Sequence, residues 1–485
     1  MKNWFNLAKI IIFSISLLAL ISRFINIDNL VIFHDEAIYI NTARDIGITQ
    51  ISTWKSSFQN EVQKPPLVLL LAKTVINNTD EDLVKTRQLS VIFGILTVLI
   101  SYLLIKDFFG TTEALISVVL FSFSPFMFFY QRLYVFESFL LFFYLLTLYF
   151  YLQVLKKFTI KKAIILFMLA FILAGLKQSI YFWVPSLLFF PFLKIKLKDF
   201  RKIIKPLLIF LSGLVIGLTT FIILSQGDYF SPGDTFIIKS ANLSLFFKNC
   251  LACFVWMKSY LTTPGFLLTV FILMTAFIFQ IGKKSLSKVY LFLLLVFLPL
   301  LVQSIIANYF LPRYIFLSFA LFLVFLAWQL DYLIKKNKSI FISCCLSLIL
   351  CFAYFDFKLI FDPVSAPLHQ NETWQYISGS PSGWGIKEIS EYILSNDPKA
   401  SVASIGVRMM PSSALDYYLN KKDIRITEYS GVNDKDKIWE EYLVFQNDLN
   451  NNFQPPLGYE KILEFRKPLG DMTVYLYKNS HLAKI

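Results

Sequence analysis

The chain has 485 residues, of which 56% are hydrophobic and only 16% are charged, and its formal net charge is +14. This charged fraction excludes an ordinary soluble domain, in which about a quarter of the residues carry charge. The positive charge does not indicate a nucleic-acid partner, because Lys and Arg gather in short loops between apolar segments, as in the inner loops of membrane proteins. The four basic loops are 156–162, 194–205, 283–288 and 335–338.

Apolar segments long enough to cross a hydrocarbon core of about 30 Å recur along the chain. We expect about eleven transmembrane helices, with the N-terminus inside and the C-terminus outside. This orientation puts all four basic loops on the inner side of the membrane. The first segment has no small-residue cleavage site after it and is expected to stay as a helix. The expected spans are 7–25, 88–106, 113–130, 137–155, 162–176, 179–193, 206–225, 263–281, 289–307, 313–333 and 339–355.

Three segments expected outside the membrane, 26–87, 226–262 and 356–485, are too long for simple turns. Connections beyond about 12–15 residues are usually functional or disordered. In the first of them, residues 35–46 (DEAIYINTARDI) interleave apolar and polar side chains, which predicts a short helix at the membrane surface.

The composition changes after residue 355, where the long apolar segments end. Residues 385–397 place Ile at helical spacing, and three shorter segments have the composition of strands, namely 400–407, 423–430 and 471–478. We therefore predict two domains: a transmembrane domain over 1–355, which includes the loop 26–87, and a small α/β domain over 356–485 outside the membrane.

Asp35 and Glu36 stand side by side where the first apolar segment ends. Acidic residues are common in the first turn of a helix, where they complement its dipole, so a structural role has about even odds. The functional alternative is a general base at the outer edge of the bilayer that takes a proton from a hydroxyl group. The preceding His34 is a further base or metal ligand in principle, although a lone His is more often structural.

Three cations are expected on the same outer side. Lys64 precedes Pro65 and Pro66, which fix an extended turn, and its ammonium would meet a lipid phosphate at headgroup level. Arg132 and Arg313 stand at the outer ends of helices, where the bias towards inner positive charge makes arginine unexpected. For each arginine alone, snorkelling or a local ion pair such as Arg132 with Glu137 is the simpler explanation.

The order of these motifs resembles the GT-C membrane glycosyltransferases of the protein O-mannosyltransferase and aminoarabinose-transferase type (glycosyltransferase family 39). The resemblance covers about residues 1–330 and rests on an ordered set rather than on one motif. The set comprises His34-Asp35-Glu36-Ala37, Lys64-Pro65-Pro66-Leu67, Arg87-Gln88-Leu89-Ser90, Ser124-Pro125 with Arg132 and Glu137, and Gly175-Leu176-Lys177. Residues 378–393 (SGSPSGWGIKEISEYI) also resemble the start of the outer domain in bacterial and archaeal members.

The resemblance implies an all-α polytopic membrane enzyme that takes a sugar from a polyprenyl-phosphate carrier and passes it to a protein, lipid or glycan acceptor outside the cytoplasmic membrane. It implies Asp35 as the base of a single inverting step, Glu36 as its support and Lys64 as the contact to the donor phosphate. Arg132 and Arg313 are the weaker choices for phosphate contacts. Besides donor and acceptor, the resemblance implies membrane lipids as partners.

No cofactor is implied with certainty. In aminoarabinose transferases a Glu that helps bind a metal directly precedes the Lys-Pro-Pro turn, whereas this chain has Gln63, a poorer ligand, so a divalent ion has no support. The lone C-x-x-C of Cys250 and Cys253 is a weak metal signal, since a structural zinc site needs four ligands; it indicates a local disulfide or two free thiols. The rival functions are a transporter or lipid flippase, and a membrane scaffold that works through its C-terminal domain.

Overall fold

The computed structural model describes residues 14, 16–47, 66–176, 180, 183–193, 201–224, 243–281, 286–307, 310–406, 411–419, 424–429, 437–448, 454–470 and 472–481. Its contacts divide the chain into two compact units. The first comprises Met1–Ile25, Trp54–Val68 and Gln88–Ile360, and the second comprises Asn26–Thr53, Leu69–Arg87 and Phe361–Ile485. Segments from three parts of the sequence therefore form the second unit.

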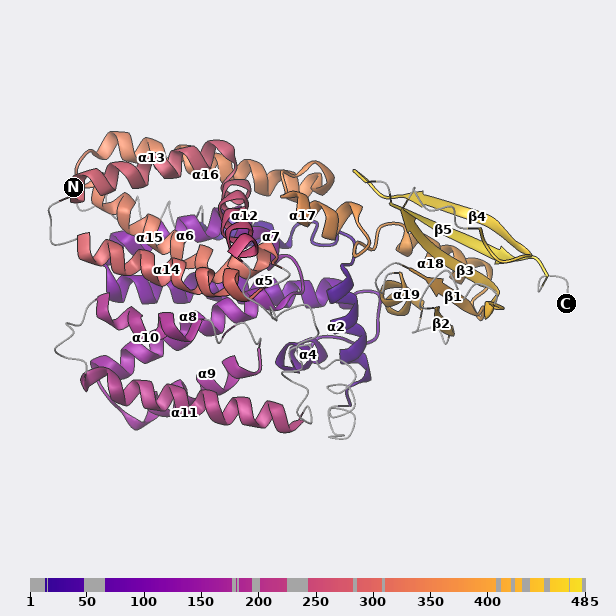
Figure 1. Ribbon diagram of the computed structural model, residues 1–485, viewed down its shortest axis with the longest axis horizontal. Helices are drawn as coiled ribbons and strands as arrows, with labels where there is room; N and C mark the ends of the chain where they lie inside the picture. Colours follow the sequence, from indigo (N-terminus) through magenta and orange to yellow (C-terminus); the bar gives the residue numbers. More distant parts are fainter. Residues whose placement is uncertain are drawn as a thin grey trace. The chain divides into compact units, whose positions relative to one another are not determined.

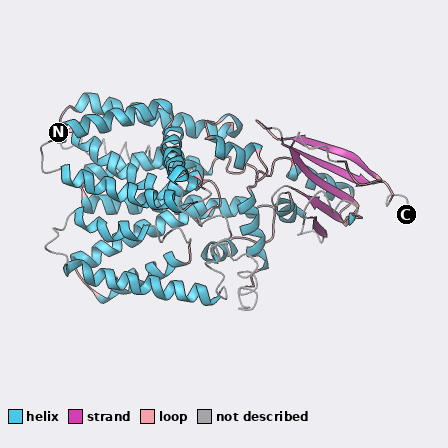
Figure 2. Cartoon of the chain, in the orientation of Figure 1, coloured by secondary structure: helices cyan, strands magenta, loops and turns pink. Residues whose placement is uncertain are grey.

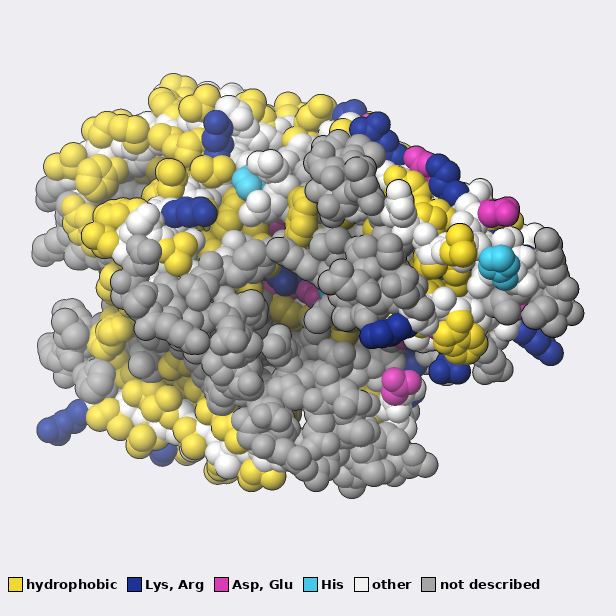
Figure 3. Space-filling model, turned by 45° about the vertical axis from the view of Figure 1, so that its right-hand side comes forward, with side chains coloured by type: hydrophobic (Ala, Val, Ile, Leu, Met, Phe, Trp, Pro, Cys, Tyr) yellow, Lys and Arg dark blue, Asp and Glu magenta, His cyan; other side chains and the backbone are white. Residues whose placement is uncertain are grey.

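The first unit is a bundle of helices (Figure 1), and many of its large apolar side chains are exposed, as on the described part of the face in Figure 3. Among the described residues, six helices are long and apolar enough to cross a membrane, or seven if the pair α6–α7, bent by 57°, is one span. The prediction of a multi-span membrane protein is confirmed, while the count of eleven stays a prediction. The helices of the bundle are η1 (Ser22–Phe24), α5 (Asp82–Phe108), α6 (Thr111–Phe123), α7 (Pro125–Gln131), α8 (Phe136–Lys156), α9 (Ile160–Ala174), α10 (Val184–Phe189), η3 (Phe190–Leu193), α11 (Arg201–Leu224), α12 (Leu243–Leu261), α13 (Thr263–Gln280), α14 (Leu286–Ile306), η6 (Pro312–Ile315), α15 (Phe316–Ile334) and α16 (Lys338–Phe361).

Small residues allow α9 and α11 to pack closely. A Cβ atom on Gly213 would lie 2.3 Å from the backbone oxygen of Phe167, and one on Gly217 would lie 2.8 Å from that of Phe171. Two glycines four residues apart make such an approach between helices possible in a bilayer. One helix was not expected: α12 lies within the predicted outside segment 226–262 and carries Cys250 and Cys253, both free thiols.

The second unit contains all the strands that the structure describes (Figure 2). They form one sheet in the order β2-β1-β3-β5-β4, in which β1 pairs in parallel with β2 and β3, and β5 pairs antiparallel with β3 and β4. The strands are β1 (Val402–Ile405), β2 (Ile426–Tyr429), β3 (Tyr442–Asp448), β4 (Tyr459–Arg466) and β5 (Met472–Asn479). The α/β prediction for this region is confirmed, and β3 and β4 are additional to it.

Among the helices of the second unit, α19 packs against β2, α18 and α2, and so connects the sheet with the earlier part of the chain. The amphipathic helix predicted near 385–397 is α18, whose isoleucines are fully buried. The helices are α2 (His34–Asp45), η7 (Pro363–Ser365), α17 (Gln370–Thr373), the π-helix η8 (Trp374–Ser378), α18 (Ile386–Asn396) and α19 (Ser412–Leu419). The short helix α4 (Pro66–Lys73) begins in the first unit and ends in the second.

Candidate active site

The two predicted catalytic carboxylates lie in the first turn of α2, in the second unit. Glu36 stands at the third position of the helix, and the backbone N–H of Phe33, the residue before the helix, donates to its Oε2 over 3.1 Å. This is the acidic half of a capping box, which satisfies a backbone donor that has no partner within the helix. Asp35 is 9% exposed. The negative charges complement the positive end of the helix, so the structural role considered for this pair is realised at Glu36.

Glu36 forms a buried two-pronged ion pair with Arg87. Nε of Arg87 donates to Oε1 over 2.9 Å, Nη2 donates to Oε2 over 2.7 Å, and both side chains are fully buried. The remaining N–H groups of this guanidinium donate to backbone oxygens of the loop before α2, those of Ile27, Leu30 and Val31. Both oxygens of Glu36 are therefore engaged in fixing the start of α2.

The rest of α2 is held by α19 and by the start of α5, within the same unit. Nδ1 of His34 lies 2.9 Å from Oγ of Ser413, so His34 has a structural partner. Arg44 donates to the backbone oxygen of Tyr417 over 2.9 Å and pairs with Asp82 at 3.0 Å. The helix that carries Asp35 is thus anchored at both ends.

Arg132 and Arg313 lie at one corner of the first unit, where the chain passes from α7 to α8. Arg132 is the residue after α7, and the guanidinium of Arg313 lies 5.8 Å from the ring centroid of Phe136, the first residue of α8. Tyr134 lies between Arg132 and Phe136 in the sequence, and its hydroxyl donates to the backbone oxygen of Val68 over 2.6 Å. The beginning of α4, four residues after Lys64, is therefore tied to the corner that holds both arginines.

The contacts of Arg132 are those of a structural arginine. Its Nη1 donates to the backbone oxygens of Arg23 over 3.0 Å and Ile25 over 2.8 Å, at the end of η1. The guanidinium lies 5.3 Å from the ring centroid of Phe128, and it interacts electrostatically with the buried carboxyl of Asp356. Arg132 therefore joins the end of the first helical segment to the α7–α8 corner.

Lys64, Pro65 and Gln63 lie outside the described residues. Pro66 is described and is the first residue of α4, a position that suits proline because its missing N–H would have no partner there. Over the described ranges, no three His, Cys, Asp or Glu side chains come together as a metal site would require.

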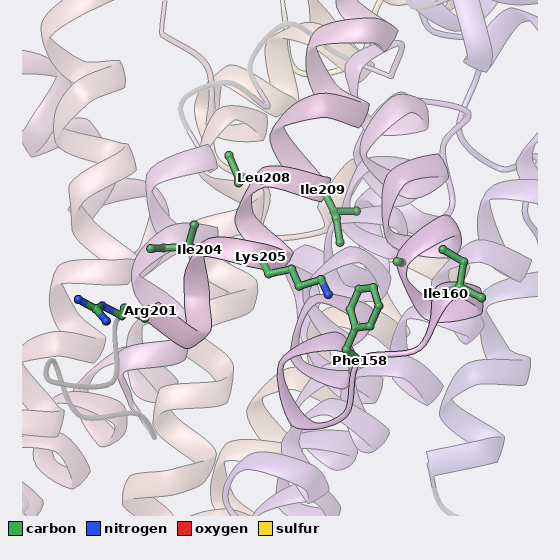
Figure 4. Close-up of a pocket in the computed structure, with 8 residues that line it drawn as sticks. Phe158, Ile160, Arg201, Ile204, Lys205, Leu208 and Ile209 are labelled. Carbon is green, nitrogen blue, oxygen red and sulfur yellow. The ribbon is translucent and has the colours of Figure 1, made fainter.

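A pocket of about 600 Å³ lies in the first unit between the starts of α9 and α11 (Figure 4). Apolar side chains line most of it, together with Arg201 and Lys205, and Nζ of Lys205 lies 3.4 Å from the ring centroid of Phe158. It adjoins the end of α8 opposite to Phe136, and a helix of 21 residues is about 30 Å long. This pocket is distinct from the corner that holds Arg132 and Arg313.

Arg87 and Tyr134 are the site residues that sequence reasoning did not assign. Arg87 opens the Arg87-Gln88-Leu89-Ser90 segment of the family pattern, but nothing in the sequence connects it with Glu36, 51 residues earlier. Tyr134 follows Arg132 by two residues, and its tie to Val68 spans 66 residues. Nothing in the neighbouring sequence identifies these partners, because Arg87 stands among other polar residues and a buried polar group can pair with any distant segment.

Comparison with known protein families gives a match over part of the chain. Residues 63–225 match the sequence profile described as dolichyl-phosphate-mannose-protein mannosyltransferase. Comparison with curated proteins gives no match.

Solved structures supply the fold. ArnT from Cupriavidus metallidurans, bound to undecaprenyl phosphate, superposes with a TM-score of 0.62 at 12% identity over 98% of both chains. An oligosaccharyltransferase from Archaeoglobus fulgidus, in complex with Zn and sulfate, gives 0.53 at 10% identity over 89% of this chain and 68% of the other. The oligosaccharyltransferase AglB from the same organism, with an inhibitory peptide and a dolichol-phosphate, gives 0.51 at 12% identity over 97% and 74%. The chain is therefore a membrane glycosyltransferase with the GT-C fold, and residues 63–225, about a third of its length, match the dolichyl-phosphate-mannose-protein mannosyltransferase profile.

Proposed function

We propose that this enzyme transfers a sugar from a polyprenyl-phosphate donor to a hydroxyl-bearing acceptor on the outer face of the cytoplasmic membrane, with inversion at the anomeric carbon. The observation that carries the proposal is the shared fold with ArnT over 98% of both chains, since the ArnT structure holds undecaprenyl phosphate. The AglB structure holds dolichol-phosphate, a carrier of the same chemical class. The acceptor is a protein, a lipid or a glycan.

Asp35 is the proposed general base. In the step, the acceptor oxygen bonds to the anomeric carbon, its proton passes to Asp35, and the carbon–oxygen bond to the phosphate breaks. The neighbouring Glu36 has both oxygens bound by Arg87. This division of labour assigns the proton to Asp35 and the support of α2 to Glu36.

Cations must stabilise the charge that develops on the departing polyprenyl phosphate. We assign this task to Lys64 and Arg313. The hydrogen bond from Tyr134 to Val68 supports the assignment, because it ties the helix that follows Lys64 to the corner of Arg313. Arg132 donates to backbone carbonyls at this corner, so we assign it to holding the corner in place.

A transporter or lipid flippase is the alternative from another class. It accounts for the apolar helices but gives no role to a carboxylate beside a buried Glu–Arg pair, or to a family domain whose described activity is glycosyl transfer. In sealed vesicles a transporter moves the lipid-linked sugar across the bilayer and forms no new glycosidic bond.

The test uses the full chain in lipid nanodiscs with radiolabelled undecaprenyl-phosphate mannose, glucose and aminoarabinose, and a membrane extract as the source of acceptors. We expect Asp35→Asn and Lys64→Ala to insert and fold as the wild type does and to abolish transfer. Asp397→Asn, in the second unit after α18, is the control and keeps full activity. Full activity of Asp35→Asn would remove Asp35 as the base, and NMR of the anomeric protons of donor and product tests inversion.

A further inference from the structure

The start of α2 is paired with a turn formed by residues 379–383 of the same unit, more than 340 residues later in the chain. The N–H of His34 donates to the backbone oxygen of Pro381 over 3.0 Å, and the N–H of Gly383 donates to that of Ile32 over 3.0 Å. Phe33 and Ser382 face each other across this antiparallel bridge. The residue directly before Asp35 is therefore held by the 379–383 turn.

The contact is too close for a side chain on the turn. A Cβ atom on Gly383 would lie 2.6 Å from the backbone oxygen of Ile32, and one on Gly379 would lie 2.4 Å from that of Trp374. Next to the bridge, the rings of Phe33 and Tyr376 pack with their centroids 4.5 Å apart. Of the glycines in SGSPSGWG, Gly383 therefore lets the turn reach the backbone in front of α2, and Gly379 lets the turn fold against Trp374.

Lys467, the residue after β4, holds the turn from its other side. Its Nζ donates to the backbone oxygens of Gly379, over 3.0 Å, and Ser382, and to Oε1 of Gln446 over 2.9 Å. In its protonated form this side chain has three N–H donors, which match the three acceptors, whereas the neutral amine has only two. Lys467 is 2% exposed, and among the described residues no carboxylate accepts a hydrogen bond from its Nζ.

Gln446 extends this network to a third residue of the turn. Its Nε2 donates to the backbone oxygen of Ser380 over 3.1 Å, from the middle of the sheet. Burial of a lysine costs free energy that three hydrogen bonds to uncharged acceptors only partly offset. A hydrophobic side chain at this position would fill the space without holding the turn, so the stability of the domain alone does not account for the lysine.

We propose that Lys467 is a positioning residue for the reaction: by holding the 379–383 turn against Ile32–His34, it fixes the orientation of Asp35. The proposal rests on the proposed function for the role of Asp35, but the contacts themselves do not depend on it. This role would make the C-terminal sheet contribute to sugar transfer without contact between the sheet and the donor or acceptor.

The test compares Lys467→Met with Lys461→Met in the full chain. Lys461 lies in β4, is exposed, and pairs with Glu464 at 2.6 Å, so its loss removes a lysine and an ion pair without touching the turn. We call the contact of the 379–383 turn with Ile32–His34, held by Lys467, the clamp. Hydrogen exchange of the peptide that covers residues 30–40 measures how firmly this contact holds, and it does not require enzyme activity. We expect exchange at His34 to be about tenfold faster or more in Lys467→Met, and unchanged in Lys461→Met.

Turnover separates positioning from a purely structural role. With undecaprenyl-phosphate mannose as donor, or with whichever of the three donors the wild type uses, kcat of folded Lys467→Met should fall about 10- to 100-fold while the donor KM stays the same. Affinity for undecaprenyl phosphate itself should be unchanged. A structural role alone would lower the amount of folded enzyme and leave kcat per folded molecule as it was.

Gly383→Ala gives a second route to the same contact. The added methyl group must displace Ile32 while Lys467 keeps its acceptors, so exchange at His34 should rise and kcat should fall as in Lys467→Met. This variant carries the test if Lys467→Met does not fold.

The two proposals fail in different ways. Unchanged exchange at residues 32–36 in folded Lys467→Met and Gly383→Ala overturns the clamp, whatever the activity. Faster exchange with unchanged kcat overturns the positioning role. No transfer by the wild type from any of the three donors counts against the proposed function, and the exchange result then still decides whether the clamp exists.

Discussion

Arg87 and Glu36 form a fully buried, two-pronged ion pair that joins the first turn of α2 to the start of α5, with N–O distances of 2.9 and 2.7 Å. The same guanidinium donates to three backbone oxygens of the loop between η1 and α2. One side chain thus organises both the loop and the helix that carries Asp35.

Arg87→Met is expected to destabilise the protein severely. It leaves the Glu36 carboxylate buried without its partner, which typically costs about 3–5 kcal/mol. The double variant Glu36→Gln with Arg87→Met removes the unpaired charge and should recover part of that loss. Thermal unfolding of the purified full chain measures both; equal Tm values for the single and double variants would contradict the buried-charge explanation.

Arg87→Lys tests geometry at constant charge. Lysine keeps the positive charge but cannot bind both carboxylate oxygens and three carbonyls from one planar group. We expect folded protein with lower kcat and faster hydrogen exchange at residues 27–36. Wild-type kcat in this variant would show that charge alone is sufficient at position 87.

Tyr134→Phe is expected to weaken donor binding. It removes the 2.6 Å hydrogen bond to the backbone oxygen of Val68, a net loss of about 0.5–1.5 kcal/mol, and frees the start of α4 from the corner of Arg313. The donor KM should rise several-fold with little change in kcat. The matched control is Tyr354→Phe, since Tyr354 is exposed on α16. A lower kcat at unchanged KM would place Tyr134 in the chemical step instead.

Residues 26–47 show what the sequence could predict and what it could not. The helix over 35–46 was predictable because its apolar residues recur at helical spacing, and the structure places α2 at His34–Asp45. Its partners were not predictable, because Arg87, Ser413 and Pro381 are distant in sequence and their types are common on any surface. Local periodicity determines a helix, whereas the packing of buried polar groups determines where it lies.

The C-terminal sheet makes the same point with strands. Three strands were predicted from their apolar and β-branched composition, and β1, β2 and β5 lie where they were expected. The strand β3 was missed although it pairs with both β1 and β5, since YLVFQND ends in three polar residues. One of these, Gln446, is fully buried and bonds to Lys467 and Ser380. One of the polar residues that made the strand hard to predict therefore helps to hold the 379–383 turn.

Membrane orientation can be tested with cysteine labelling in a variant that lacks the five native cysteines. The predicted orientation puts Lys399 outside and Lys161 inside, and both are exposed, which suits a labelling site. A membrane-impermeant maleimide on intact cells should modify Lys399→Cys at once and Lys161→Cys only after lysis. The reverse pattern would invert the orientation and move the proposed reaction to the other face of the membrane.

The pH dependence of stability should reveal the protonation state of Lys467 in the folded protein. Burial lowers the pKa of Lys467 to about 7, from an ordinary value of 10.5. Between these two values the unfolded chain holds a proton that the folded chain has released, so the free energy of unfolding due to this group rises with pH across that window. We expect the Tm difference between wild type and Lys467→Met to shift in favour of the wild type as pH increases from 7 to 10. In Lys461→Met, which removes an exposed lysine, the difference from wild type should not change in this way. A constant difference between wild type and Lys467→Met would show that the buried ammonium keeps its proton in the folded protein throughout this range.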